Sequence, residues 1–167
     1  MGNKKKGTRI KNDNQIEYKN NYILWIDDEI NTPEYEEKIK TLKNKNIGTI
    51  IPIDSPDTFL EYINNSNNDP EKHKCIILDL HFKSSGKGVF EKISTGTNVG
   101  KKILEILKAE NSRWKNILIV VFTGMRAAGI ESLYYGKRVI VLQKNQYHPH
   151  PSKLAEEIKK AINDNTL

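Results

Sequence analysis

The sequence predicts an α/β fold in which an open, doubly wound sheet of five parallel strands carries helices on both faces. The first observation is that five short apolar runs recur along the chain: Tyr22–Ile26, Gly48–Ile53, Cys75–Leu78, Ile117–Phe122 and Arg138–Leu142. These runs are mostly continuous rather than alternating, which is typical of parallel strands buried on both faces. The second observation is that a segment of helical periodicity follows each run, and this alternation indicates right-handed βαβ units.

The segment after the first run has the signals of a helix. Thr32-Pro33 is typical of a helix N-terminus, with the threonine as N-cap and the proline as first helical residue. The apolar residues Tyr35, Ile39 and Leu42 recur at helical spacing, so they would lie on one face. We expect this face to pack on the sheet.

Pro52 within the second run indicates where that strand lies in the sheet. Proline cannot donate a ladder hydrogen bond, so a strand that contains it belongs at an edge. The second strand is an edge strand in the flavodoxin-like strand order 2-1-3-4-5, and the two observations therefore agree. We predict a flavodoxin-like, doubly wound five-stranded parallel sheet in this order.

The other helices are predicted from capping residues and apolar spacing. Ser55 and Ser152 would cap the second and the last helix, and Gly136 would stop a short helix over Ala127–Tyr135. The residues expected to face the sheet share helical spacing: Phe59, Leu60, Ile63, Val99, Ile103, Leu104, Leu107, Leu154, Ile158 and Ile162.

Length and composition are those of one globular domain. The chain has 167 residues, of which 37% are hydrophobic and 29% charged. No apolar run reaches membrane-spanning length and no signal peptide opens the chain, so we expect no membrane association. The single cysteine, Cys75, can form no internal disulfide, which fits a reducing cytoplasm. We therefore expect a cytoplasmic protein.

The positive charge is concentrated at the start of the chain. Residues 1–20 carry six basic and two acidic side chains, which account for +4 of the net charge of +6. We predict that residues 1–20 are a basic, disordered tail and that residues 21–167 form the domain. The domain is not expected to bind nucleic acid, whereas the tail is a candidate for such contact.

Acidic side chains follow two of the predicted strands where each strand ends. Asp27 and Asp28 follow the first strand, and Asp79 follows the third. Because the carboxyl ends of neighbouring parallel strands meet at one crevice, these acids would repel each other and raise at least one pKa unless a cation lies among them. Hard oxygen ligands suit Mg²⁺, which often binds beside phosphate. The sequence therefore predicts a site that handles a phosphoryl group at Mg²⁺.

Two further polar residues end the next two strands. Thr123 ends the fourth strand and is followed by Gly124, which keeps the crevice open, and Lys144 follows the fifth strand. A phosphorylated carboxylate would need such partners, because a hydroxyl can hydrogen-bond a phosphoryl oxygen and a lysine can neutralise it.

Taken in order, these motifs resemble the receiver domain of two-component response regulators. They are Ile26-Asp27-Asp28-Glu29, Leu78-Asp79-Leu80, Phe122-Thr123-Gly124 and Gln143-Lys144, and the resemblance covers roughly residues 22–162. Each motif alone is common, but their order with helix-sized gaps between them is much more specific.

The resemblance implies a set of roles. Asp79 would accept phosphate, and Thr123 and Lys144 would contact the phosphoryl group. Asp27, Asp28, Asp79 and the backbone carbonyl of His81 would hold Mg²⁺. The implied partner is a histidine kinase or a phosphotransfer protein; the sequence does not name the downstream protein. The chain would not be an enzyme beyond catalysing its own phosphorylation.

The sequence departs from the receiver pattern in four places. The segment Phe82–Thr95 lengthens the loop after the acceptor and could form a basic, flexible flap over the site. The usual Met-Pro after the acceptor is absent. Asn145 replaces the proline that follows the lysine, so we expect a trans peptide there. Val141 stands where many receivers carry an aromatic residue, which puts the usual threonine-to-aromatic coupling in question.

Three functions compete on these observations. The first is a phospho-accepting receiver, expected to stand alone because no output domain follows Ile162. The second is a pseudo-receiver, a phosphorylation-independent interaction module that the departures favour. The third, ranked lowest, is a haloacid-dehalogenase-like phosphatase, because the first strand is followed by Asp27-Asp28-Glu29 and not by Asp-x-Asp.

Overall fold

Five parallel strands form the centre of the computed structural model, which describes residues 21–124, 127 and 129–165. In chain order the strands are β1 (Tyr22–Ile26), β2 (Thr49–Ile53), β3 (His73–Leu78), β4 (Ile119–Thr123) and β5 (Val139–Gln143). They lie in the order β2-β1-β3-β4-β5, and every neighbouring pair is parallel. The predicted fold class and strand order are confirmed. The predicted basic tail, residues 1–20, lies outside the described residues.

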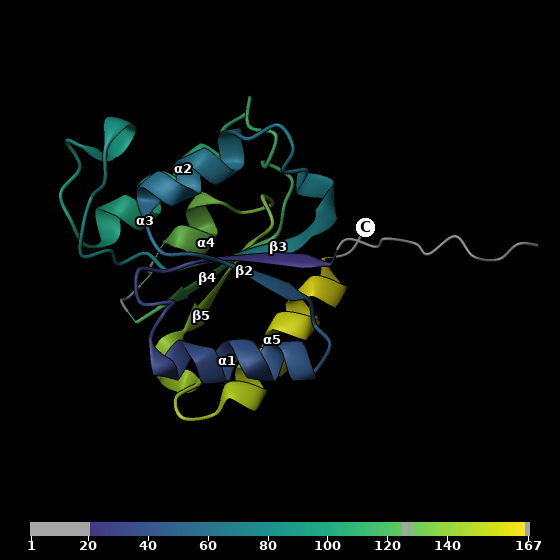
Figure 1. Cartoon of the computed structure of the whole chain (residues 1–167). Helices are drawn as coiled ribbons and strands as arrows, with labels where there is room; N and C mark the ends of the chain where they lie inside the picture. The colour runs from purple at the N-terminus through teal and green to yellow at the C-terminus, as the bar shows by residue number, and fades with distance from the viewer. Residues whose placement is uncertain (1–20, 125–126, 128, 166–167) are drawn as a thin grey trace, which may run out of the picture.

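The helices form one layer on each face of the sheet (Figure 1). They are α1 (Pro33–Asn44), α2 (Pro56–Asn64), α3 (Thr97–Lys108), α4 (Ile130–Leu133) and α5 (Pro151–Asp164). Short 3₁₀ turns lie at Pro70–Lys72, Gly88–Phe90 and Lys144–Gln146. One hydrophobic cluster lies between the sheet and α2, α3 and α4, and a second between the sheet and α1 and α5. Within the described chain, no helix has both the length and the apolarity needed to cross a bilayer.

Local hydrogen bonding explains where element boundaries differ from prediction. Ser55 caps α2 as expected, since its side chain accepts a bond from the backbone of Thr58. The last helix instead begins at Pro151, so Ser152 lies inside it and is not its cap. The fourth helix begins only at Ile130 because the preceding Gly129 has a φ of +84°, which a right-handed helix does not allow, and it ends at Leu133, two residues before the predicted end.

The strand ends also shift by one or two residues. β3 begins at His73, earlier than predicted, because this residue pairs with Tyr22 of β1. β4 begins at Ile119, later than predicted, because the backbone N–H of Ile117 is used in a turn with the carbonyl of Trp114. Pairing between distant segments, which the local pattern does not contain, decides these ends.

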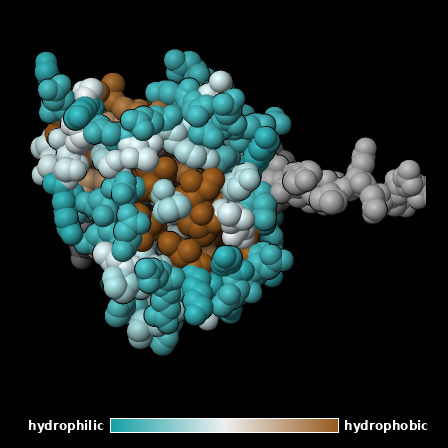
Figure 2. Space-filling model, viewed as in Figure 1, coloured by the Kyte–Doolittle hydropathy of each residue, from teal (hydrophilic) through white to brown (hydrophobic). Residues whose placement is uncertain are grey.

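The open edge of β2 is apolar, and Pro52 removes one of its outward-facing backbone donors. Thr49 donates to Asn21, and Ile53 accepts from Asp27, so these residues direct their backbone groups toward β1. Because backbone groups alternate along a strand, Pro52 lies on the outward side, where its missing N–H costs no ladder bond. Figure 2 shows an apolar patch at the centre of the face where Figure 1 places β2. Proline here protects this patch against pairing with a strand of another molecule.

Cys75 lies in the middle of β3 and is fully buried. Burial raises the pKa of its thiol to about 12, and the thiol is therefore protonated at neutral pH. The residue acts as a small core side chain.

Lys108 at the end of α3 is a buried cation that joins the helix to the entry of β4. Only 4% of the residue is exposed, and its ammonium group donates to the carbonyls of Lys115 at 2.9 Å and Ile117 at 2.5 Å. Burial lowers the pKa of Lys108 to about 8, helped by the positive charges of Arg138 and Lys137.

We expect this lowered pKa to make stability depend on pH. Between about pH 8 and the unfolded lysine value of about 10.4, the unfolded chain binds more protons at this position, so the free energy of unfolding should rise with pH. Urea titrations of wild type and Lys108→Met across this window measure the difference. In Lys108→Met the free energy of unfolding should increase less with pH than in wild type. The control variant Lys159→Met, on the exposed side of α5, should show the same increase as wild type. Identical pH slopes in wild type and Lys108→Met would contradict the assignment.

Candidate functional site

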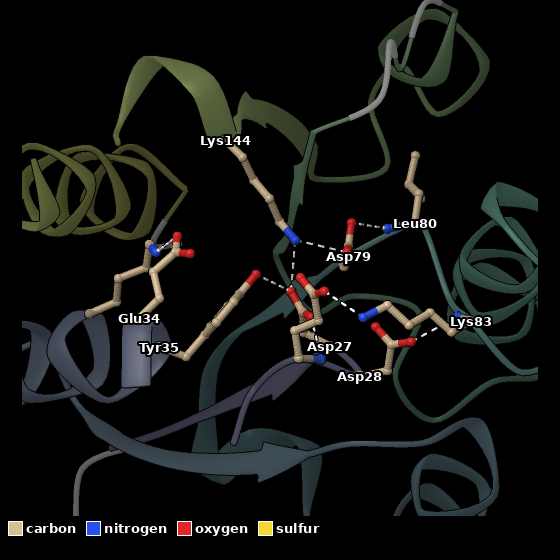
Figure 3. A network of polar contacts seen from close by, with 10 residues as sticks. Asp27, Asp28, Glu34, Tyr35, Asp79, Leu80, Lys83 and Lys144 are labelled. Atoms are coloured by element: carbon tan, nitrogen blue, oxygen red, sulfur yellow. Dashed lines mark hydrogen bonds and ion pairs between the residues drawn. The ribbon is translucent and has the colours of Figure 1, made fainter. Parts of the chain in front are cut away.

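The carboxyl edge of the sheet brings together residues that lie far apart in the sequence. Asp27 follows β1, Asp79 follows β3, Thr123 is the last residue of β4 and Lys144 follows β5. The ammonium nitrogen of Lys144 lies 2.8 Å from Asp79 Oδ2 and 2.9 Å from Asp27 Oδ2, so one cation bridges two carboxylates (Figure 3). Thr123 is fully buried at the same edge. The predicted approach of Lys144 to Asp79 is confirmed.

Burial and charge act against each other in this cluster. Burial raises the pKa of Asp27, the charge of Asp79 raises it further, and Lys144 and the Tyr35 hydroxyl reduce the effect without cancelling it. For Lys144, burial lowers the pKa, but the two carboxylates outweigh burial and the pKa is raised overall. Lys144 therefore stays charged at neutral pH, as expected for a lysine paired with carboxylates.

Asp27 is held by more donors than the sequence indicated. Its Oδ1 accepts a hydrogen bond from the backbone N–H of Glu29 at 2.9 Å. Its Oδ2 accepts one from the hydroxyl of Tyr35 at 2.5 Å, in addition to the contact with Lys144. The sequence placed Tyr35 on the apolar face of the first helix, which is correct, but its hydroxyl was missed as part of the site. The one available signal was a tyrosine on the core face of the helix directly after the acid pair.

Asp28 and Glu29 are bound by Lys83 in the lengthened loop. The backbone N–H of Lys83 donates to Asp28 Oδ2 at 2.7 Å, and its ammonium group lies 2.7 Å from Glu29 Oε1 (Figure 3). The hydrogen bond from Lys83 lowers the pKa of Glu29. This ion pair is exposed, so it adds little stability, but the amide contact orients the Asp28 carboxylate.

The loop that was expected to be a flexible flap has several fixed contacts. Phe82 forms an antiparallel bridge with Gly96, and the side chains of Phe82 and Phe90 are fully buried in the core beneath α2 and α3. The backbone N–H of Lys87 donates to Asp57 Oδ1 at 2.7 Å, at the start of α2. The segment Phe82–Thr95 is therefore anchored in the core, and its Lys83 contacts Asp28 and Glu29 of the site.

The backbone around the remaining predicted residues is regular. The Lys144–Asn145 peptide is trans, as expected, because the cis bond among the described residues is His148–Pro149. His81 is exposed, two residues after Asp79. Between them, the backbone N–H of Leu80 donates to Asp79 Oδ1 at 2.7 Å and fixes the Asp79 carboxylate.

The donor set fits Mg²⁺ in its chemistry, although it is small. In the described part of the chain, no three His, Cys, Asp or Glu side chains are grouped as a metal site. Asp27 accepts from Glu29 through Oδ1 and from both Tyr35 and Lys144 through Oδ2. Among the described residues it thus has more donors than Asp28 or Asp79, and it is less suited to direct ligation. Asp28, Asp79 and the carbonyl of His81 remain, and Mg²⁺ needs only one or two carboxylates because it keeps several waters.

No known family model matches the sequence, and no curated protein matches it either. Solved structures do match. The chain aligns over 87% of its length with 97% of a response regulator receiver protein from Sinorhizobium medicae WSM419, with a TM-score of 0.56 and 17% identity. It aligns over 87% with 94% of a receiver domain from Rhodospirillum rubrum, with a TM-score of 0.55 and 15% identity. The bacteriophytochrome response regulator AtBRR gives a TM-score of 0.50 at 18% identity, over 84% of this chain and 93% of that one.

These likenesses show that the chain has the fold of receiver domains, which confirms the resemblance at the level of the fold. The same fold also occurs within a much larger protein of another class. The lysine decarboxylase LdcF from Francisella novicida matches 87% of this chain with only 17% of its own length, with a TM-score of 0.50 and 14% identity. Function must therefore be argued from the site.

Proposed function

We propose that this protein is a phospho-accepting receiver in two-component or phosphorelay signalling, with Asp79 as the phosphoacceptor and Mg²⁺ as the cofactor. The observation that carries the proposal is the bridge from Lys144 to Asp79 and Asp27 at the carboxyl edge of a receiver fold. A buried acid pair with one shared cation is more than the fold requires, and perturbed charged groups in such a place favour a functional role.

In the proposed reaction, a carboxylate oxygen of Asp79 attacks the phosphorus of a phosphohistidine on a partner kinase or phosphotransfer protein. A phosphorus–oxygen bond forms, the phosphorus–nitrogen bond breaks, and the histidine leaves with the electron pair of that bond. Lys144 neutralises the transferred group, and the hydroxyl of Thr123 hydrogen-bonds one of its oxygens. Mg²⁺, held by Asp28, Asp79 and the His81 carbonyl with Asp27 nearby, would neutralise charge on the phosphoryl oxygens.

Labelling with a small phosphodonor tests this function. The full chain is incubated with acetyl phosphate and Mg²⁺, and its intact mass is measured over time. A receiver gains about 80 Da, one phosphoryl group, and keeps it for minutes. Peptide mapping should place the adduct on Asp79. Absence of any adduct would favour the pseudo-receiver, and steady release of phosphate without an adduct would favour a phosphatase.

The pseudo-receiver is the second candidate because of specific observations. Asn145 and Val141 depart from the receiver pattern, and Lys83 of the anchored loop already binds the carboxylate of Asp28. A protein that used the fold only to bind a partner would tolerate these features.

Mg²⁺ is expected to stabilise the folded protein by mass action. At a concentration ten times its dissociation constant, it should add about 1.4 kcal/mol to the free energy of unfolding. Thermal melting with and without Mg²⁺ measures this effect in wild type and in Asp28→Ala, which should lose most of it. Asp54→Ala, which removes an exposed aspartate just after β2, is the matched control and should keep the full shift. A shift of equal size in Asp28→Ala would mean that the ion binds elsewhere.

A further inference from the structure

Tyr35 of α1 shares an acceptor atom with the lysine of the site. Its hydroxyl lies 2.5 Å from Asp27 Oδ2, and the ammonium group of Lys144 lies 2.9 Å from the same oxygen. The residue is only 3% exposed, so no bulk water can replace its hydroxyl. One oxygen of a fully buried carboxylate thus has two donors, one neutral and one charged (Figure 3).

Packing fixes the position of the Tyr35 ring. The Trp25 ring meets it edge-on, with ring centroids 5.4 Å apart, and Lys38 lies 4.8 Å from its centroid on helix α1. The ammonium group of Lys144 lies 5.4 Å from the Tyr35 ring and 5.7 Å from the Phe122 ring, between two aromatic side chains. The hydroxyl therefore stays directed at Asp27 whatever Lys144 does.

The two donors differ in how far they can move. Lys144 has a flexible side chain and already contacts Asp79, and a phosphoryl group there would draw it away from Asp27. Loss of the charged donor from a buried carboxylate is costly, because less of its desolvation is then compensated. Tyr35 removes much of this cost, because it continues to donate to Asp27 Oδ2 after Lys144 has moved.

We propose that Tyr35 is a positioning residue that holds the buried Asp27 carboxylate in place while Lys144 moves from Asp27 to the phosphoryl group on Asp79. This inference rests on the proposed function. The inference gives the first helix a role in the reaction. A phenylalanine at position 35 would keep the ring but lack the hydroxyl, and so could not perform this role.

The test compares labelling kinetics of wild type, Tyr35→Phe and Tyr147→Phe. Tyr147 is also buried and packs on Phe122, and so controls for the loss of a hydroxyl near the site. Tyr35→Phe should lower the maximal labelling rate about tenfold, the usual effect of losing one hydrogen bond to a buried charge. The acetyl phosphate and Mg²⁺ concentrations for half-maximal labelling should stay within about twofold, because neither binds to Tyr35. Tyr147→Phe should label like wild type.

A background without the charge at position 27 separates positioning from simple packing. In Asp27→Asn the neutral amide needs no replacement donor, so adding Tyr35→Phe should slow labelling by less than about twofold. Melting in Mg²⁺ with and without a continuing supply of acetyl phosphate gives a second measure, since Tyr35→Phe should lower the melting temperature more where the protein is kept labelled. The inference would be overturned if Tyr35→Phe lowered the melting temperature equally in both forms. It would also be overturned if Tyr35→Phe slowed labelling as much in the Asp27→Asn background as in wild type. Wild type that takes up no phosphoryl group would overturn the proposed function itself, and this inference with it.

Discussion

Replacing Asp79 by asparagine is expected to abolish phosphoryl uptake while leaving the fold intact. The amide cannot act as the nucleophile, but its oxygen can still accept the hydrogen bond from the backbone of Leu80. Lys144 keeps its contact with Asp27, so no buried charge is left without a partner. We expect no mass adduct with acetyl phosphate and Mg²⁺, and a free energy of unfolding within about 1 kcal/mol of wild type.

Asp54→Asn is the matched control for this experiment, because Asp54 also follows a strand at the carboxyl edge of the sheet but is exposed. It should label at the wild-type rate. An adduct of undiminished yield in Asp79→Asn would place the acceptor on another residue. A loss of more than about 2 kcal/mol of stability would instead indicate that Asp79 is mainly structural.

Replacing Gly100 by alanine is expected to be the most damaging single-methyl change in this region. Gly100 lies in the first part of α3, and its backbone N–H donates to the carbonyl of Leu80 at 3.1 Å. A Cβ atom there would lie 2.2 Å from the Cα of Leu80, which is backbone and cannot rotate away. The helix or the strand end must therefore shift, and we expect a loss of at least about 3 kcal/mol in urea unfolding.

The same substitution should also impair the site, because Leu80 fixes the Asp79 carboxylate through its N–H. Labelling of Gly100→Ala should be slower than wild type even where the variant is still folded. Gly124→Ala is the control, since a Cβ at Gly124 meets no described atom within 4 Å. It should cost less than about 1 kcal/mol. Because alanine favours a helix more than glycine does, helix propensity alone would stabilise Gly100→Ala. A loss in Gly100→Ala no larger than that in Gly124→Ala would therefore contradict the predicted clash with Leu80.

The sequence predicted the architecture because the strands are continuous apolar runs and the edge strand contains Pro52. It located strand and helix ends less well. Ser152 has the chemistry of a cap, but Pro151 starts the helix one residue earlier, and the turn that uses Ile117 delays β4. These ends depend on which distant backbone group a residue meets, and local propensity contains no such information.

The predicted site residues that end strands were placed correctly, for a physical reason. A parallel sheet brings the carboxyl ends of its strands to one edge, so Asp27, Asp79 and Lys144 had to lie close together once the fold was right. Tyr35 and Lys83 could not be found in this way. The hydroxyl of Tyr35 reaches Asp27 only because of the rotation of α1 on the sheet, and the backbone N–H of Lys83 reaches Asp28 across 55 residues of sequence.

The burial of Cys75 has a practical consequence for studying the loop Phe82–Thr95, which follows Asp79. The chain contains a single cysteine, and its protonated, inaccessible thiol will not react with maleimides near neutral pH. A cysteine substituted for Val89, which is 56% exposed within that loop, would be the one thiol on the protein that reacts with the label. A fluorophore or spin label can therefore be attached to the loop without first removing the native cysteine, and the core of the sheet stays unaltered.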